Sequence, residues 1–242
     1  MDSFVADIKQ KGYYYGPVIK GTELTNISKE MNDRIANNNR LKNTNDNFAL
    51  LDQPYMIDDC LSLALSDEFL QFPFLFFGAR PFYLGTCNLR RSFATQTPDH
   101  STTLYHRDQN LGSLENTKNN FLKVFVYLTD VSEKNGPFTY VEGSNNSVLE
   151  NTRQYRHTDK EINGLYLNCE KKLTGKFGQV IVADTTGLHK GTKVKDGSRD
   201  MLTMIYTTIE EKGASNFFIK KKMLDSLIEQ KREICKYLTV VE

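Results

Sequence analysis

The chain has 242 residues, enough to bury a sizeable hydrophobic core in a single domain. Its formal net charge of +1 argues against a surface that coats nucleic acid and against a polybasic membrane patch, so we expect neither as a partner. The longest apolar run, Phe72–Phe77, contains Pro73 and is too short to span a bilayer. The four cysteines form no C-x-x-C pair, and the N-terminus lacks the apolar region of a secretory signal. We therefore expect a cytoplasmic protein with reduced cysteines.

The first third of the chain has the periodicity of helices. The expected elements are a helix over Asp2–Gln10 that buries Phe4, Val5 and Ile8, a short strand over 12–16, a helix with apolar positions Leu24, Ile27, Met31 and Ile35, an Asn-rich surface loop over 37–47, and one or two helices over 57–77 interrupted at Pro73.

After Gly78 the pattern changes from helix to strand. The expected strands are Pro81–Leu89, Thr102–Asp108, Phe121–Val131, Pro137–Val141, Gln179–Asp184 and Met201–Ile209, followed by a helix over Ile219–Leu238. Clusters of Gly, Pro, Asn and Asp separate the strands, as in a β-sandwich or barrel. The sequence therefore predicts a mainly β fold with helices packed on its outside.

One expected strand has two quite different faces. Lys123, Phe125 and Tyr127 share one face, and the apolar residues at 122, 124 and 126 share the other. One of these faces must line the interior of the barrel, and the sequence does not determine which.

Two histidines and an aspartate have the order that an iron site needs. His106 and Asp108 flank a single residue, so on a strand they point to the same side. His189 follows a second apolar strand and would complete a facial triad of two imidazoles and one carboxylate, which leaves positions open on the metal. Arg199 opens the last strand, and its planar guanidinium suits a carboxylate-bearing cosubstrate.

Each of these residues also has a simpler explanation. His106 could be a strand histidine that is hydrogen-bonded to Asp108, and Arg199 could form a surface ion pair with Asp196 or Asp200. The order of the residues and the strands around them favour the metal site.

Several segments in the same order resemble the phytanoyl-CoA dioxygenase-like (PhyH) family of Fe(II)/2-oxoglutarate-dependent oxygenases, from about Gly12 to Ile209. Besides His106-x-Asp108, the similar segments are Lys11-Gly12-Tyr13-Tyr14, Phe125 to Val131, Asn135-Gly136-Pro137, Val141-Glu142-Gly143-Ser144, and Lys176 to Gly191 with His189. The chain departs from the family pattern at Glu142, Asn145, Gln179 and Gly191, where the family usually has Pro, His, an acidic residue and Ser.

The resemblance implies a double-stranded β-helix core, the jelly-roll of cupin-like proteins, over about 79–210. No linker is long enough to divide the chain, so we expect a single domain over 1–242, with a helical part over 1–78 and a C-terminal helix over 219–238. The resemblance also implies that His106, Asp108 and His189 hold Fe(II) and that Arg199 binds 2-oxoglutarate. Thr192 or Thr203 could add a hydrogen bond to this cosubstrate, and Asn88 could contact it.

The activity that the resemblance implies is oxidation of a small molecule with O2, while 2-oxoglutarate is converted to succinate and CO2. In halogenating relatives a small residue replaces the acidic ligand, so Asp108 favours hydroxylation. The alternatives are a cupin-like protein that binds metal or ligand without turnover, and a zinc hydrolase, which would leave Arg199 without a role.

The sequence does not identify the substrate or the oligomeric state. The long polar segments Asn37–Pro54, Gln109–Asn120 and Leu149–Leu173 are expected to be loops that cover the site.

Overall fold

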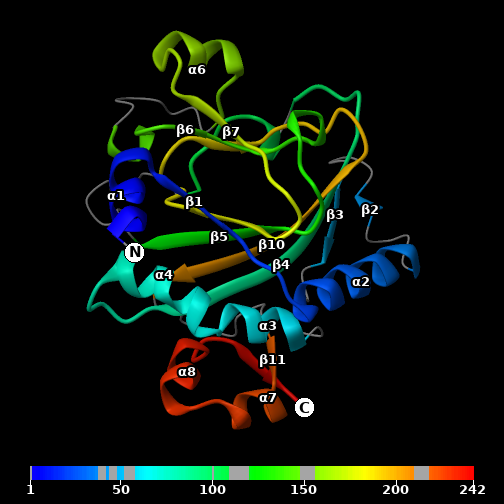
Figure 1. The fold of residues 1–242 in the computed structure, drawn as a ribbon, viewed down its shortest axis with the longest axis vertical. Coiled ribbons are helices and arrows are strands. Elements are labelled where there is room, and N and C mark those ends of the chain that lie inside the picture. Colours follow the sequence, from blue (N-terminus) through cyan, green and yellow to red (C-terminus); the bar gives the residue numbers. More distant parts are fainter. Residues whose placement is uncertain are drawn as a thin grey trace.

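Two sheets face each other in the computed structural model and enclose the interior of a barrel (Figure 1). The structure describes residues 2–37, 42–43, 48–51, 58–99, 101–108, 120–147, 156–209 and 218–242. Most of two of the segments expected to cover the site, Asn37–Pro54 and Gln109–Asn120, therefore lie outside the described residues.

The larger sheet has seven antiparallel strands in the order β1-β8-β5-β10-β4-β3-β2. These strands are β1 (Tyr13–Val18), β2 (Lys42–Asn43), β3 (Phe48–Leu51), β4 (Tyr83–Phe93), β5 (Phe121–Tyr127), β8 (Gln179–Ala183) and β10 (Ser198–Thr207). The smaller sheet has the order β7-β6-β9 and consists of β6 (Phe138–Val141), β7 (Glu170–Leu173) and β9 (His189–Gly191). This arrangement confirms the predicted double-stranded β-helix.

The two faces of β5 pack against different parts of the molecule. Phe125 and Tyr127 belong to the cluster between the two sheets, where the rings of Phe125 and Phe138 have centroids 4.6 Å apart. Leu122, Val124 and Val126 belong to the cluster shared with the helices. Because side chains alternate along a strand, Lys123 lies on the inner face with Phe125. The structure thus resolves which face lines the barrel.

Helices cover the outer face of the larger sheet (Figure 1). They are α2 (Thr22–Asn37), α3 (Asp58–Ala64) and α4 (Asp67–Phe77), while α1 (Asp2–Lys11) lies at the end of the barrel beside β1. The predicted apolar positions of α2 are all buried, because a spacing of three or four residues keeps them on one side of the helix. In α1, Phe4 and Ile8 are buried as predicted, but Val5 is exposed.

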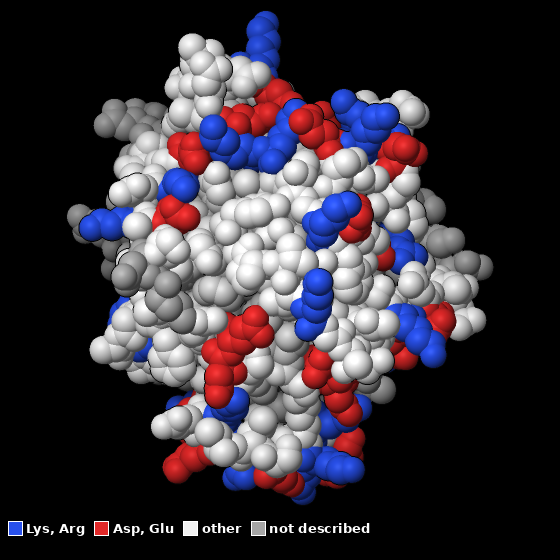
Figure 2. Space-filling view, in the orientation of Figure 1, with Lys and Arg blue, Asp and Glu red and all other residues white. Residues whose placement is uncertain are grey.

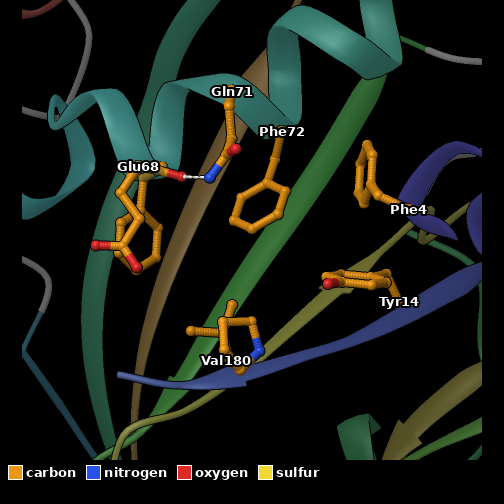
Figure 3. A pocket seen from close by; sticks show the side chains of 8 residues that line it. Phe4, Tyr14, Glu68, Gln71, Phe72 and Val180 are labelled. Atoms are coloured by element: carbon orange, nitrogen blue, oxygen red, sulfur yellow. Dashed lines mark hydrogen bonds between the residues drawn. The ribbon is translucent and has the colours of Figure 1, made fainter. Parts of the chain in front are cut away.

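The break between α3 and α4 falls before Ser66, not at Pro73 as predicted. The hydroxyl of Ser66 accepts a hydrogen bond from the backbone N–H of Phe69, which caps the start of α4. Pro73 lies inside α4 and is buried. The same helix packs Phe72 against Phe4, with ring centroids 5.2 Å apart, above Tyr14 of β1 (Figure 3). Packing of these rings fixes α4 on the sheet.

The prediction of one continuous helix over Ile219–Leu238 is wrong. The chain forms β11 (Phe218–Lys220), two short helices, α7 (Lys221–Ser226) and α8 (Glu229–Ile234), and β12 (Thr239–Val241), which pairs in parallel with β11. The hydroxyl of Ser226 bonds back to the carbonyl of Met223, and the Arg232 guanidinium bonds the carbonyl of Leu227. These side chains satisfy carbonyls where the helix ends, so a turn replaces the continuous helix.

Two further sequence-based expectations are corrected. The segment Thr102–Asp108 forms a 3-10 turn over Ser101–Thr103 and two isolated bridges, not a regular strand. The described part of Leu149–Leu173 contains helix α6 (Asp159–Leu165) and strand β7, so it is not only a loop. Thr158 caps α6 through a capping box with Glu161.

Charge is well mixed over the surface of the molecule seen in Figure 2. Lysine and arginine side chains alternate there with aspartate and glutamate, around a broad uncharged band. Among the described residues, no single helix has the length and hydropathy needed to cross a membrane; α3 and α4 meet that test only as a bent pair. Within α4, Phe69, Leu70 and Phe72 are buried in the protein core.

Candidate metal centre

The two histidines of the predicted triad lie side by side across a short antiparallel bridge. The backbone N–H of His106 donates to the carbonyl of His189 at 2.9 Å, and the reverse bond measures 3.0 Å. The imidazole centroids are 4.4 Å apart, and both side chains are buried. Pairing of the two backbones therefore fixes the distance between the rings.

Each imidazole is oriented by a carbonyl two residues earlier in the chain. Nδ1 of His106 lies 2.9 Å from the oxygen of Leu104, and Nδ1 of His189 lies 2.9 Å from the oxygen of Gly187. A carbonyl only accepts, so Nδ1 carries the hydrogen in both rings. This tautomer leaves Nε2 of each ring as the free lone pair, which is the arrangement of a metal ligand.

Asp108 supplies the carboxylate between the two Nε2 atoms. Its backbone N–H donates to the carbonyl of Thr185 at 3.1 Å. The carboxylate oxygens lie 3.4 Å from Nε2 of His189 and 4.0 Å from Nε2 of His106. The second distance exceeds a hydrogen bond, so the simpler explanation of His106 as a partner of Asp108 is not supported.

Burial and neighbouring charge keep His106 and Asp108 in the ionic forms that bind metal. Burial, together with the nearby His189, lowers the pKa of His106 to about 3, so its imidazole is neutral at physiological pH. Burial by itself would raise the pKa of Asp108, but His189 and Lys123 together hold it well below its usual range. The three donor atoms lie within 4.8 Å of one another. Two imidazoles and one carboxylate fit a divalent transition metal and match the facial triad of non-haem iron.

Arg199 enters the same interior from β10 and is 4% exposed. Its guanidinium donates to the carbonyl of Gly136 and to Oγ of Ser92, the latter at 3.2 Å. Its Nε is buried without a hydrogen-bond partner, and no carboxylate among the described residues pairs with it. The alternative of a surface ion pair with Asp196 or Asp200 is therefore wrong, and a buried cation without a counter-ion fits an anionic ligand.

Gly191 makes room for the Arg199 guanidinium. A Cβ atom at this position would lie 3.0 Å from Nη2 of Arg199, closer than most side-chain contacts. Gly191 follows His189 by two residues on β9, so both face the interior. Gly191, at the position where the family usually has Ser, therefore leaves space beside the Arg199 guanidinium that a side chain would otherwise fill.

The other predicted cosubstrate contacts are divided between the two faces. Asn88 of β4 lies opposite Thr203 of β10, which lies opposite Phe125, so Asn88 and Thr203 face the interior with Phe125. Thr192 follows β9 on the other face, where its hydroxyl is 2.7 Å from that of Thr139. The structure brings Asn88 and Thr203 toward the interior and does not bring Thr192 there.

Lys123 is a site residue that the sequence analysis did not assign. Its ammonium lies 2.7 Å from a carboxylate oxygen of Asp108. The signal in the sequence was a lysine within the otherwise apolar strand Phe121–Tyr127. That signal alone could not distinguish a lysine inside the barrel from one that projects to solvent.

Arg107, between the two ligands, is a second residue that was missed. Its guanidinium donates to the carbonyls of Ser144, Thr186 and Ser147. These bonds fasten the turn after β6 and the connection between β8 and β9 to the segment that holds Asp108. Asn145 in the same turn donates to the carbonyl of Ile8 at 3.2 Å, which ties the turn to α1.

The fold and this site together define a class: a double-stranded β-helix protein with two histidines and one carboxylate at the barrel interior. The phytanoyl-CoA dioxygenase (PhyH) family model matches residues 24–199, and the chain belongs to this family. It is thereby an enzyme of the Fe/2-oxoglutarate-dependent oxygenase superfamily. No curated protein matches the sequence significantly.

Solved structures share the fold at low sequence identity. The epimerase SnoN, in complex with Fe3+, alpha ketoglutarate and nogalamycin RO, has a TM-score of 0.66 at 17% identity, over 85% of this chain and 82% of that chain. HygX from Streptomyces hygroscopicus, with nickel, 2-oxoglutarate and hygromycin B bound, has a TM-score of 0.63 at 17% identity, over 90% and 89%. EctD from S. alaskensis, with 2-oxoglutarate and 5-hydroxyectoine, has a TM-score of 0.62 at 16% identity, over 84% and 74%.

Proposed function

We propose that the chain is an Fe(II)- and 2-oxoglutarate-dependent dioxygenase that hydroxylates a small molecule. The observation that carries the proposal is the convergence of His106, Asp108 and His189 with a buried Arg199 that has no acidic partner among the described residues. A metal site alone would fit several classes of protein. The guanidinium inside the same barrel adds the partner that a dicarboxylic cosubstrate needs.

His106, Asp108 and His189 would hold the ferrous ion, and Arg199 would bind the distal carboxylate of 2-oxoglutarate. Asn88 and Thr203 face the same interior and would donate hydrogen bonds to 2-oxoglutarate. Bound Fe(II) with 2-oxoglutarate and O2 would supply the oxidising chemistry, with release of succinate and CO2. The aromatic rings of Phe125, Phe138 and Tyr140 would exclude water from the reacting atoms.

Two considerations support hydroxylation of a small molecule. Asp108 is an intact carboxylate ligand, which favours hydroxylation over halogenation. The structures similar to this one hold nogalamycin RO, hygromycin B or 5-hydroxyectoine, which are small molecules. Because these neighbours include an epimerase and a carbocyclase, the gain of one oxygen atom in the product is the result that distinguishes hydroxylation.

The proposal is tested without knowledge of the substrate by adding Fe(II) and 2-oxoglutarate to the protein in the absence of O2. We expect the weak visible charge-transfer band of the iron chelate. Asp108→Ala should lose it because one of three ligands is missing, whereas Thr192→Val, on the outer face, should keep it. Metal binding without the band would favour a cupin-like binding protein. With a substrate found by screening, His106→Ala, Asp108→Ala and His189→Ala should each abolish substrate-linked succinate formation.

A further inference from the structure

Lys123 is a cation whose hydrogen-bonding capacity is mostly unused. Its side chain is 18% exposed and extends from the inner face of β5, between Ala183 of β8 and Ile205 of β10. Neither neighbour is polar. The only acceptor of its ammonium among the described residues is Asp108, at 2.7 Å. An ammonium has three N–H donors, so two of them have no protein acceptor in the described part of the chain.

The charges of the loaded site would balance without Lys123; this step rests on the proposed function. The two positive charges of Fe(II) and the one on Arg199 would offset the carboxylate of Asp108 and both carboxylates of 2-oxoglutarate. Among the charged side chains that the structure describes, the ammonium of Lys123 is then surplus. Arg90, which also faces inward from β4 and donates to Thr102, is positive as well and does not offset it. An uncompensated cation in a largely buried site favours an anion.

The surplus charge lies on the accessible side of the metal centre. The side chain of Asp108 is 24% exposed, while those of His106 and His189 are 8% and 5% exposed. Lys123 contacts the most exposed of the three ligands. A molecule that approaches the metal from solvent therefore meets the Asp108 and Lys123 side chains before the imidazoles.

We propose that Lys123 binds an acidic group of the substrate, a carboxylate or a phosphate monoester, beside the metal. Its ammonium keeps one hydrogen bond to Asp108 and donates the others to the substrate anion. It thus links the substrate to a metal ligand and selects anionic over neutral molecules.

The test uses the protein loaded with Mn(II) and 2-oxoglutarate, which allows binding to be measured without turnover. The probes are two matched pairs, phenylacetate with phenylacetamide and phenyl phosphate with phenol. The paramagnetic broadening of probe protons by Mn(II), measured by NMR, reports binding close to the metal. We expect at least one anion to bind about tenfold more tightly than its neutral counterpart. The pair that shows this preference distinguishes a carboxylate from a phosphate substrate.

Lys123→Gln should remove the preference, and Lys123→Arg, which keeps the charge, should retain most of it. Lys222→Gln removes one exposed positive charge from α7 and should change nothing. Equal binding of acid and neutral probe by the unaltered protein would overturn the proposal without reference to any variant. So would an unchanged preference in Lys123→Gln. If the Fe(II) chelate band forms but no anion is preferred, the role of Lys123 is contradicted and the proposed function is not. If the band is absent, the proposed function itself is contradicted.

Discussion

Arg199 combines two properties that rarely coexist: it is buried, and no acidic side chain of the described residues neutralises it. Burial lowers the pKa of the guanidinium, which nevertheless stays charged because its ordinary value is so high. Keeping such a charge in a protein interior is costly. A carboxylate that binds there repays that cost, so we expect Arg199 to dominate affinity for the cosubstrate.

Replacing Arg199 by Gln should weaken binding of 2-oxoglutarate about 10- to 100-fold, because a charge-assisted pair of hydrogen bonds is lost. Titration of the Fe(II) protein with 2-oxoglutarate, followed by the visible band without O2, measures this. Thr192→Val is the matched control, since its hydroxyl bonds Thr139 on the opposite face. Similar affinities in the two variants would contradict the assignment of Arg199.

The buried carboxyl of Asp184 should make the free energy of unfolding depend on pH. Asp184 is 4% exposed, and burial raises the pKa of its carboxyl above the usual 3.8, although Thr186 and Asn145 donate hydrogen bonds that act against the shift. The folded protein therefore holds the proton to higher pH than the unfolded chain. The free energy of unfolding should fall as pH rises between the two pKa values, by at most about 1.4 kcal/mol per pH unit, and level off above them.

Asp184→Asn removes this titration while it keeps the size of the side chain. The difference in the free energy of unfolding between this variant and the unaltered protein should shift in favour of the variant as pH rises between the unfolded and folded pKa values, and become constant above both. Urea unfolding at several pH values measures it. A difference that does not vary with pH would mean that the carboxyl titrates alike in both states.

Among individual residues, the convergence of His106, Asp108 and His189 and the inward position of Arg199 could be predicted from their order in the chain. Lys123 and Thr192 could not be placed. A strand pattern gives two faces without stating which is inner, and that choice depends on which sheet packs against which. Thr192 is one residue beyond the inward position held by Gly191, and a shift of one residue reverses the face.

At the scale of elements, β4 and β10 are joined by an ion pair as well as by backbone hydrogen bonds. Arg91 bonds both carboxylate oxygens of Asp200 at 2.6 and 2.5 Å, and it also donates to Asn32 of α2. Asp200 is 2% exposed. The pair lies on the outer face of the sheet, next to Arg199 in sequence, and ties a helix to the strand that carries Arg199.

Asp200→Ala should lower the free energy of unfolding by about 3–5 kcal/mol, because it leaves Arg91 partly buried and without its counter-ion. Glu30→Ala breaks the pair of Glu30 with Arg34 on the exposed side of α2 and should cost less than about 1 kcal/mol. Chemical denaturation of both variants gives the comparison. Equal losses would show that burial does not set the strength of the Arg91 pair.

The longer elements could be predicted, and their ends could not. Strands β1, β4, β5, β8 and β10 and helix α2 follow from hydrophobic periodicity, which burial enforces along the whole element. The short strands β7, β9, β11 and β12 and helix α6 were not predicted. The ends depend on single side-chain bonds, such as those of Ser66 and Ser226. The segment with His106 shows the same limit: its alternating residues predicted a strand, but only Tyr105 and His106 find bridge partners, His157 and His189.

For the whole molecule, the site joins parts that are distant in the chain. His189 belongs to the smaller sheet, and Arg199 and Lys123 belong to the larger one. Asp108 belongs to the segment that connects β4 and β5. The order of helices followed by strands along the chain predicted that helices pack on the outside of a β core. The order of strands within each sheet was implied only by the family resemblance, because long-range pairing leaves no local signal.

Ligands that connect the two sheets should stabilise the whole barrel. We expect Mn(II) to raise the melting temperature and 2-oxoglutarate to raise it further, each ligand contributing about 2.7 kcal/mol at a hundred times its dissociation constant. In Arg199→Gln the metal should keep its effect, and the same concentration of 2-oxoglutarate should add much less. Calorimetry measures both increments. A full 2-oxoglutarate increment in this variant would place its binding elsewhere.

The carbonyls of Leu104 and Gly187 give the two histidines a shared property: each ring is aimed by a bond made within three consecutive residues. The carbonyl that orients each ring lies two residues before the histidine, so the orientation depends on no contact with a distant segment. Substitutions elsewhere around the barrel opening can therefore accumulate during evolution, and the protein can adopt new substrates, while the coordinating nitrogens keep their direction.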